Sequence, residues 1–355
     1  MPMPAPDEPR RAGGPPGPEE PPTTAAEVDA RPAGAPGADE AHGAGETGEV
    51  AEALTEGAGE AERVVESVDD GATEADREDG RPDWPAGITS ARRALQLGLP
   101  GWPKPGDELP PPPTPVPHGR GGAQRIPRPY TAQLGGPAPW ADVDAARRRP
   151  TLDDVRSVLA DVGPPRRSER EVGPLDPTEA GRPASVLAPL YDEAGRAVVI
   201  LTRRTWGLST HQGEVSFPGG RVEAGETERD AALREAKEEI SLDPSLVEVI
   251  GELDHLNTLS SRSYIVPYVG VLDGGRPQLS PNPGEVEVVL HVPLAELLDP
   301  TIFREEIWPF PGGYQRSIYF FELVGDTVWG MTAALLRQLL GMLTGTLGRG
   351  DLGHP

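Results

Sequence analysis

The segment GRVEAGETERDAALREAKEEISL, residues 220–242, joins a glycine turn to an amphipathic helical pattern and carries the strongest signal in the chain. Within it Glu238 and Glu239 follow Glu235 by three and four residues, a spacing that places the three carboxylates on one face of a helix. Without a counter-charge these carboxylates would repel one another. Oxygen ligands of this kind suit Mg²⁺ or Mn²⁺. The pattern therefore predicts a helix over residues 228–240 with a site for a divalent cation.

The remaining faces of this helix agree with a buried position. Arg234 flanks the carboxylates and can pair with Glu238 or reach back to Glu226. At about 100° per residue, the apolar side chains gather on the opposite side. They are Leu233, Ala236 and Ile240. The alternative is a solvated helix with surface glutamates, but a fixed spacing to Gly220 and Glu226 favours the functional interpretation.

This spacing resembles the box of the Nudix hydrolases, G-x5-E-x7-R-E-U-x-E-E-x-G-U, where U is a bulky aliphatic residue. The chain matches that box at Gly220, Glu226, Arg234, Glu235, Glu238, Glu239 and Leu242. It departs at Ala236, which is smaller than usual, and at Ser241, where the box has glycine. Since Ser241 ends the predicted helix, this change concerns turn geometry and not the acidic face.

The resemblance implies Mg²⁺- or Mn²⁺-dependent hydrolysis of a nucleoside diphosphate that is linked to another group. It implies that Glu235 and Glu239 bind the metal directly and that Glu238 shares metal or water duties. By the same match, Glu226 is the fourth acidic residue of the metal site and Arg234 orients the carboxylates. The implied substrate is a small molecule, and the expected assembly is a homodimer.

The residues before the box resemble the signature of the coenzyme A pyrophosphatase branch, L-L-T-x-R-[SA]-x3-R-x3-G-x3-F-P-G-G. The matching residues are ILTRRT at 200–205, Gly213 and FPGG at 217–220. Thr205 replaces a Ser or Ala, and Ser209 replaces an Arg that could meet a substrate phosphate. Coenzyme A or an acyl derivative is therefore the first substrate hypothesis. ADP-ribose, NADH or a dinucleotide is the second, and a non-catalytic Nudix binding module is the third.

Further candidate residues surround the box. Gly219 and Gly220 allow the close backbone approach that a phosphate-bearing ligand would use. Arg203 and Arg204 end a predicted strand, and one of them can contact a phosphate while the other is a surface charge. The sequence leaves open which is which.

Two more residues are candidates for the site. His211 lies in the loop before the box, where it either lines the site or forms a structural hydrogen bond. Glu285 lies on a Pro/Gly loop before a strand. It is a candidate metal ligand or general base, with a solvent-facing loop glutamate as the alternative.

Composition divides the chain into two parts. The 355 residues include 44 Gly and 44 Pro and carry a net charge of −24. Residues 1–80 contain 21 acidic and 5 basic side chains, so most of the charge lies in a segment too poor in large apolar residues to build a core. Proline runs continue this character, and we expect a disordered arm and linker over residues 1–135, whose removal leaves activity intact. A Nudix hydrolase domain is expected over residues 136–350.

Helical and strand patterns alternate irregularly in the second part, which predicts an α+β fold, an α-β-α sandwich with a mixed sheet. Besides the acidic helix, the expected helices cover residues 151–162 and 331–343, with a helical turn at 293–298. The expected strands cover residues 184–191, 197–202, 246–253, 265–272, 286–292 and 318–323.

Some classes of protein are excluded or disfavoured by composition. The absence of cysteine excludes disulfides and thiolate metal sites. No apolar run approaches the roughly 20 residues of a membrane span, and the N-terminus lacks the apolar core of a signal peptide. The acidic balance argues against a nucleic-acid partner. We therefore expect a cytoplasmic protein with no membrane or nucleic-acid partner.

Overall fold

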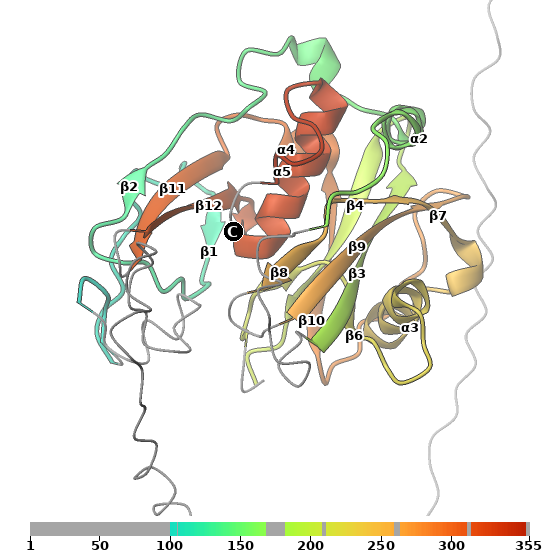
Figure 1. Cartoon of the computed structure of the whole chain (residues 1–355), viewed down its shortest axis with the longest axis horizontal. Helices are drawn as coiled ribbons and strands as arrows, with labels where there is room; N and C mark the ends of the chain where they lie inside the picture. Colours follow the sequence, from blue (N-terminus) through green and yellow to red (C-terminus); the bar gives the residue numbers. More distant parts are fainter. Residues whose placement is uncertain are drawn as a thin grey trace, which may run out of the picture. The chain divides into compact units, whose positions relative to one another are not determined.

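The computed structural model describes residues 100–104, 106–167, 182–207, 211–258, 263–310 and 314–352. These residues form a mixed sheet with helices on both faces, which confirms the expected α-β-α architecture (Figure 1). Residues 1–99, most of the expected arm, lie outside the described part of the chain. No helix in the described ranges has the length and apolar character to cross a membrane.

The central sheet has the strand order β10-β4-β3-β9-β7. Its strands are β3 (Arg182–Asp192), β4 (Ala197–Arg204), β7 (Val247–Glu252), β9 (Ser263–Leu272) and β10 (Val286–Pro293). Three short strands extend it, namely β5 (Val215–Ser216), β6 (Gly219–Arg221) and β8 (Leu256–Thr258). Strands β3 and β9 run parallel, whereas β10/β4, β3/β4 and β7/β9 are antiparallel pairs. The sheet is therefore mixed, as the sequence predicts.

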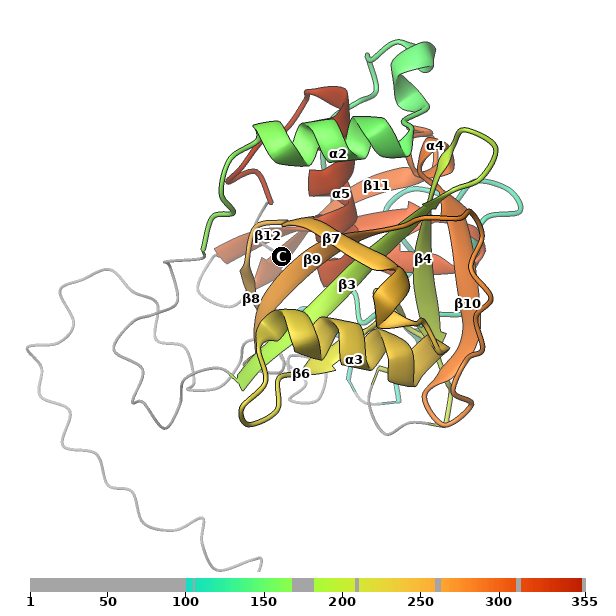
Figure 2. The same ribbon diagram turned by 90° about the vertical axis from the view of Figure 1, so that its right-hand side faces the viewer.

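Both faces of the central sheet are buried, which explains the continuous apolar run in β4. Val198 and Ile200 pack on one side with helix α3 (Glu228–Ile240), whereas Val199 and Leu201 face the opposite core. Figure 2 shows α3 lying across β3 and β6. A strand covered on both sides needs apolar residues at every position, because neither face meets water.

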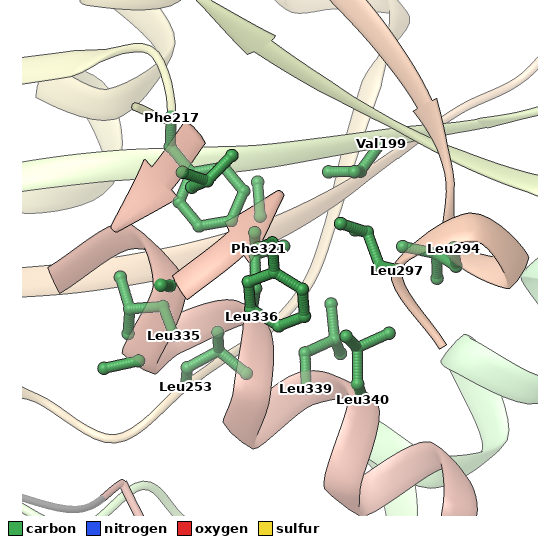
Figure 3. Packing of buried hydrophobic residues seen from close by; sticks show 14 of the residues in the cluster. Val199, Phe217, Leu253, Leu294, Leu297, Phe321, Leu335, Leu336, Leu339 and Leu340 are labelled. Carbon is green, nitrogen blue, oxygen red and sulfur yellow. The ribbon is translucent and has the colours of Figure 1, made fainter. Parts of the chain in front are cut away.

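The core on the other face contains three helices and a second sheet. The helices are α2 (Leu152–Asp161), α4 (Leu294–Leu297) and α5 (Gly330–Thr344). Figure 3 shows Val199 of β4 and the leucines of α4 and α5 pointing into this common core. Helix α5 is buried on most of its surface because it lies between the two sheets (Figure 1). The expected helices at 151–162 and 331–343 are thus confirmed, and Thr151 forms a capping box with Asp154.

The second sheet has the order β14-β12-β11-β2. Its strands are β2 (Gln133–Leu134), β11 (Phe303–Phe310), β12 (Tyr314–Glu322) and β14 (Thr327–Trp329). A separate two-stranded parallel sheet consists of β1 (Gly121–Gly122) and β13 (Val324–Gly325). Strand β11 is absent from the sequence prediction, because its FREEIWPF pattern places charged residues at buried positions.

The interpretation of residues 100–135 as an unfolded linker is wrong for the described residues. Trp102 is 4% exposed and meets Trp308 edge-on, with ring centroids 5.8 Å apart. Strand β2 pairs with β11, so the segment also contributes backbone hydrogen bonds to the second sheet. The folded part of the chain therefore begins before residue 136. Nothing in the local sequence indicates this, because the apolar and charged partners of the segment lie far along the chain.

A buried network of charges attaches the segment to the second sheet. Arg128 Nε donates to Glu306 Oε2 at 2.5 Å, and Arg304 pairs with both Glu306 and Glu322. Trp308 Nε1 donates to the same Glu306 oxygen at 2.7 Å. All four charged side chains are buried, and the two cations match the two anions. Such a network tolerates burial only while every charge keeps its partner.

We expect Arg128→Met to lower the free energy of unfolding by about 3 kcal/mol, because it leaves Glu306 undercompensated in the core. Urea denaturation measures the change. Arg120→Gln is the matched control from the same segment, since Arg120 pairs with the partly exposed Glu296 and its loss should cost under about 1 kcal/mol. Equal losses in the two variants would show that the buried network does not hold the segment.

Candidate active site

Helix α3 packs unusually close to the glycine turn that precedes it. Thr227 caps the helix by accepting from the Asp230 amide at 3.2 Å. The buried residues of its inner face are small, apart from the last: Ala231, Ala232, Ala236 and Ile240. A Cβ atom at Gly220 would lie 2.3 Å from Glu235 Oε1. The Glu235 carboxylate therefore lies against the Gly220 backbone, and a side chain at position 220 would have to displace it.

Arg234 is the centre of the acidic face. Its Nε and second guanidinium nitrogen donate to the two oxygens of Glu226 at 2.9 and 3.2 Å, and Nη1 donates to Glu235 and Glu238 at 3.0 Å each. A further bond goes to the Arg221 carbonyl at 2.9 Å. Both predicted partners, Glu226 and Glu238, are thus confirmed. The hydrogen bond from Arg234 lowers the pKa of Glu226, which keeps that carboxylate charged.

Glu239 differs from the other box glutamates because it is buried and lacks a full set of partners. Its side chain is 3% exposed, and Oε2 has no hydrogen-bond partner within the described residues. Arg204 approaches Oε1 at 3.7 Å. Burial raises the pKa of Glu239 to about 8; Arg204 opposes this shift, and the charges of Glu235 and Glu285 increase it. A buried carboxylate oxygen without a donor is a position where a cation fits.

Glu285 faces the same acidic group. Burial is the main reason why the pKa of Glu235 is raised, and the nearby charges of Glu238 and Glu285 contribute in the same direction. The Glu285 backbone is fixed beside β4, since its carbonyl accepts from the Thr205 amide at 2.9 Å. The solvent-facing alternative is correct for its exposure, yet the carboxylate lies within electrostatic reach of Glu235 and Glu239.

The arrangement fits a divalent cation through its donor chemistry. With Arg234 pairing three of the glutamates, no group of three His, Asp or Glu side chains in the described ranges is already placed to hold a metal ion. Glu239 nevertheless keeps an unpartnered oxygen, and burial together with the neighbouring carboxylates raises the pKa of Glu235. Both observations show that Arg234 does not fully compensate the buried negative charge. Oxygen donors of this kind suit Mg²⁺ or Mn²⁺.

The two arginines at the end of β4 have different partners. Arg203 donates from Nη1 to both oxygens of the buried Asp326, at 3.1 and 3.0 Å, and from Nε to Glu287 at 3.2 Å. Arg204 instead approaches Glu239. Because successive side chains of a strand point to opposite faces, only one of the pair can face the acidic helix. The structure assigns that position to Arg204.

The loop before the box is held by packing and by a side-chain hydrogen bond. His211 Nδ1 lies 2.6 Å from Glu214 Oε2, which agrees with the structural alternative for His211. Phe217 is 3% exposed and enters the core shown in Figure 3. A Cβ atom at Gly219 would lie 2.4 Å from the Ser185 carbonyl, so glycine is required there by close backbone contact. Ser209, the departure from the signature, lies outside the described residues.

Comparison with known proteins identifies the family. The NUDIX domain model matches residues 181–311, which include the glycine turn, α3 and the Glu285 loop. An uncharacterized Nudix hydrolase, NudL, from Photorhabdus laumondii is 37% identical over 164 residues, which cover 46% of this chain and 85% of that protein. The chain belongs to the Nudix family. Nudix hydrolases generally use divalent metal ions, in agreement with the donor set around Glu239.

Other relatives differ in length or in closeness. Nudix hydrolase 15, mitochondrial, from Arabidopsis thaliana is 42% identical over 162 residues, which cover 43% of this chain and 55% of that protein. The chain spans about half the length of this relative and of a second plant Nudix hydrolase. A solved Ap4A hydrolase from C. elegans is 18% identical, covering 34% of this chain and 85% of that chain with a TM-score of 0.29.

The residue that departs from the box glycine, Ser241, keeps the turn that glycine would make. It ends α3 in the left-handed region, at φ 58° and ψ 29°, and its amide donates to the Lys237 carbonyl at 2.9 Å. Its hydroxyl donates to the Ser280 carbonyl at 3.1 Å. This hydrogen bond offsets part of the cost of a non-glycine residue in that conformation.

We expect Ser241→Gly to be more stable than Ser241→Ala by about 1 kcal/mol, because both variants lose the hydroxyl but only alanine keeps the backbone strain of the left-handed conformation. Chemical denaturation of both variants beside the wild type checks the order. Equal stability of the two would show that the left-handed conformation costs nothing here.

A second expectation concerns the cation itself. Saturating Mg²⁺ or Mn²⁺ should raise the Tm of the wild type, since a ligand that binds only the folded state stabilises it by about 2.7 kcal/mol at a hundred times its Kd. Glu239→Gln should reduce or abolish that rise because the buried anionic oxygen is lost. Differential scanning fluorimetry measures the Tm of both proteins, and samples with a chelator and no added divalent cation are the control. An undiminished rise in the variant would place the cation elsewhere.

Proposed function

We propose that this chain is an Mg²⁺- or Mn²⁺-dependent Nudix pyrophosphohydrolase that cleaves the diphosphate of coenzyme A or acyl-CoA. The products would be adenosine 3',5'-bisphosphate and 4'-phosphopantetheine or its acyl form. The observation that carries the hydrolase proposal is the buried, unpartnered oxygen of Glu239 beside Glu235 and the glycine turn. The substrate proposal is supported by the residues before the box, ILTRRT and FPGG.

Glu235, Glu239 and Glu285 are the residues that would hold the cation, since their charges converge on one another. When bound, a divalent cation supplies positive charge that neutralises the diphosphate and favours ionisation of the attacking water. Glu226 has both oxygens engaged by Arg234, so we assign it to the anchoring of that arginine, with metal contact as the alternative from the family match. Arg234 then keeps the direction of the Glu235 side chain.

Hydrolysis requires a group that accepts the proton of water and a positive charge that binds the substrate phosphates. Water oxygen bonds to one phosphorus, the bridging P–O bond breaks, and the water proton passes to a carboxylate. Glu285 is exposed and faces the acidic group, so its carboxylate is the first candidate for this acceptor, a role that is the alternative to its contact with the cation. Glu238 is the second candidate; its side chain is 56% exposed and pairs with Arg234.

Arg204 is the guanidinium that we assign to the substrate phosphates. It lies on the acidic side of β4 next to Glu239, whereas Arg203 is already paired with two carboxylates. A planar guanidinium can donate two hydrogen bonds to a phosphate. Gly219 and Gly220 are not assigned to the phosphates, because the space that their Cβ atoms would take is filled by the Ser185 carbonyl and the Glu235 carboxylate.

A second substrate class is favoured by one residue. Ser209 replaces the arginine of the coenzyme A signature and removes one positive charge from the loop before the box. Another nucleoside diphosphate derivative, such as ADP-ribose, NADH or a dinucleotide, would fit the same catalytic group without needing that charge. The chemistry at the diphosphate is identical in the two cases.

The test is turnover of a substrate panel with Mg²⁺ or Mn²⁺, with products identified by mass. The panel contains coenzyme A, acetyl-CoA, ADP-ribose, NADH and dinucleoside polyphosphates. We expect Glu239→Gln to lower kcat/KM by about a thousandfold or more, because the buried ligand for the catalytic charge is lost. Glu248→Gln is the matched control, since Glu248 is an exposed glutamate of β7 that pairs with Arg156 of α2.

Each result has a separate meaning. Cleavage of coenzyme A that is lost in Glu239→Gln and kept in Glu248→Gln supports the full proposal. Cleavage of another compound alone would keep the hydrolase and reject coenzyme A. No turnover of any compound, or equal turnover in the two variants, would contradict the catalytic role and favour a binding module.

A further inference from the structure

A residue that lies before the Nudix-matched region contacts the loop that leads to the box. Gln124 Nε2 donates to the Gly213 carbonyl at 3.1 Å and to Asp326 Oδ1 at 2.8 Å, while its Oε1 accepts from the Thr327 amide at 3.0 Å. The backbone amide can only donate, so these partners determine the orientation of the side-chain amide. Gln124 therefore joins three segments that are distant in sequence.

Asp326 is the second member of this contact. It is 3% exposed, and both of its oxygens accept from Arg203, so its buried charge is compensated. Arg203 in turn pairs with Glu287 on β10. The same carboxylate thus ties the end of β4 to Gln124. Arg203 precedes Arg204, the arginine beside Glu239, so the network reaches the residue next to the site.

Gly213 is held on two sides. Its backbone has φ +65°, and a Cβ atom would lie 2.5 Å from the Trp206 ring, so the indole rests directly on the glycine. Gln124 holds the carbonyl of the same residue. From Gly213 the chain enters β5, which pairs with β4, and then buries Phe217.

The same loop leads into β6, which packs against the acidic helix. The Pro218 carbonyl accepts from the Leu187 amide at 2.9 Å, and the following Gly219 amide donates a backbone hydrogen bond to the Glu239 carboxylate. A displacement at Gly213 would therefore pass over a short, packed stretch to the backbone that contacts Glu239.

We propose that Gln124 is a positioning residue for the site, which acts through the Gly213 carbonyl and through the Asp326–Arg203 pair. It keeps residues 211–220 in the conformation that brings Gly219 to Glu239, and it keeps the end of β4 in the position that places Arg204 beside Glu239. This inference rests on the proposed hydrolase function and adds a residue outside the segment matched by the family model. Gln124 does not touch the substrate.

Two substitutions test this role. Gln124→Met keeps the length of the side chain and removes all three hydrogen bonds, whereas Gln124→Glu places a carboxylate against Asp326 and the Gly213 carbonyl. Arg120→Gln is a control from the same segment with no contact to the loop. Leu159→Ala on α2 is a control for lost stability alone, because Leu159 is a buried core residue that packs beside Gly251 of β7.

Two measurements are made on the full chain: kcat/KM at saturating Mg²⁺ on the best substrate of the panel, and amide hydrogen exchange of residues 211–220. We expect Gln124→Met to lower kcat/KM about ten- to a hundredfold and to speed exchange in this segment, with a larger loss in Gln124→Glu. The controls should leave both unchanged at a temperature well below their Tm.

Unchanged kcat/KM in Gln124→Met would overturn the proposal, whether or not exchange becomes faster. A loss no larger than that of Leu159→Ala would overturn it too, because it would report stability alone. If the wild type hydrolyses no compound of the panel, the proposed function fails. The exchange measurement then still decides whether Gln124 holds the loop.

Discussion

The close approach of α3 to the glycine turn of β6 is the constraint on which the site depends. Glu235 lies against Gly220 at a distance that leaves no room for a Cβ atom, and the alanines of α3 allow the helix to pack this near. Close packing removes water from Glu239 and Glu235 and raises the pKa of both. The burial of negative charge that makes a cation favourable is therefore a direct consequence of small residues at the contact.

Arg234 neutralises part of the negative charge of the box glutamates. Its five hydrogen bonds engage three glutamates and one carbonyl, so it holds the acidic face together while Glu239 remains without a full partner. An arginine can do this because its planar guanidinium presents donors in several fixed directions. The box glutamates therefore divide into three that bind Arg234 and one, Glu239, that faces the buried side.

Residues 100–135 and the strands β12 and β14 extend the domain beyond residues 181–311, the region that the family model matches. Their contact is built from buried aromatic rings and an alternating set of two arginines and two glutamates. Buried charges in such a set are costly to separate, so the segment is held firmly to the sheet. Since Gln124 belongs to it, the added segment reaches the loop before the box through a hydrogen bond to the Gly213 carbonyl.

The acidic helix and its two faces follow from the sequence alone, because they depend on 3.6 residues per turn and on near neighbours. It also predicted the mixed sheet and the pairing of Arg234 with Glu226 and Glu238. Local spacing is enough for such features, since the partners lie within a few turns of chain.

The fold was needed to show which arginine of β4 faces Glu239 and that residues 100–104 and 106–135 pack against the second sheet. Alternation along a strand separates Arg203 from Arg204, but the partner that identifies each face, Glu239 or Asp326, comes from another part of the fold. The charges of β11 look solvated in the sequence because Arg128, the counter-charge for Glu306, lies 178 residues away. Partners at such distances exist only after folding, and local composition carries no record of them.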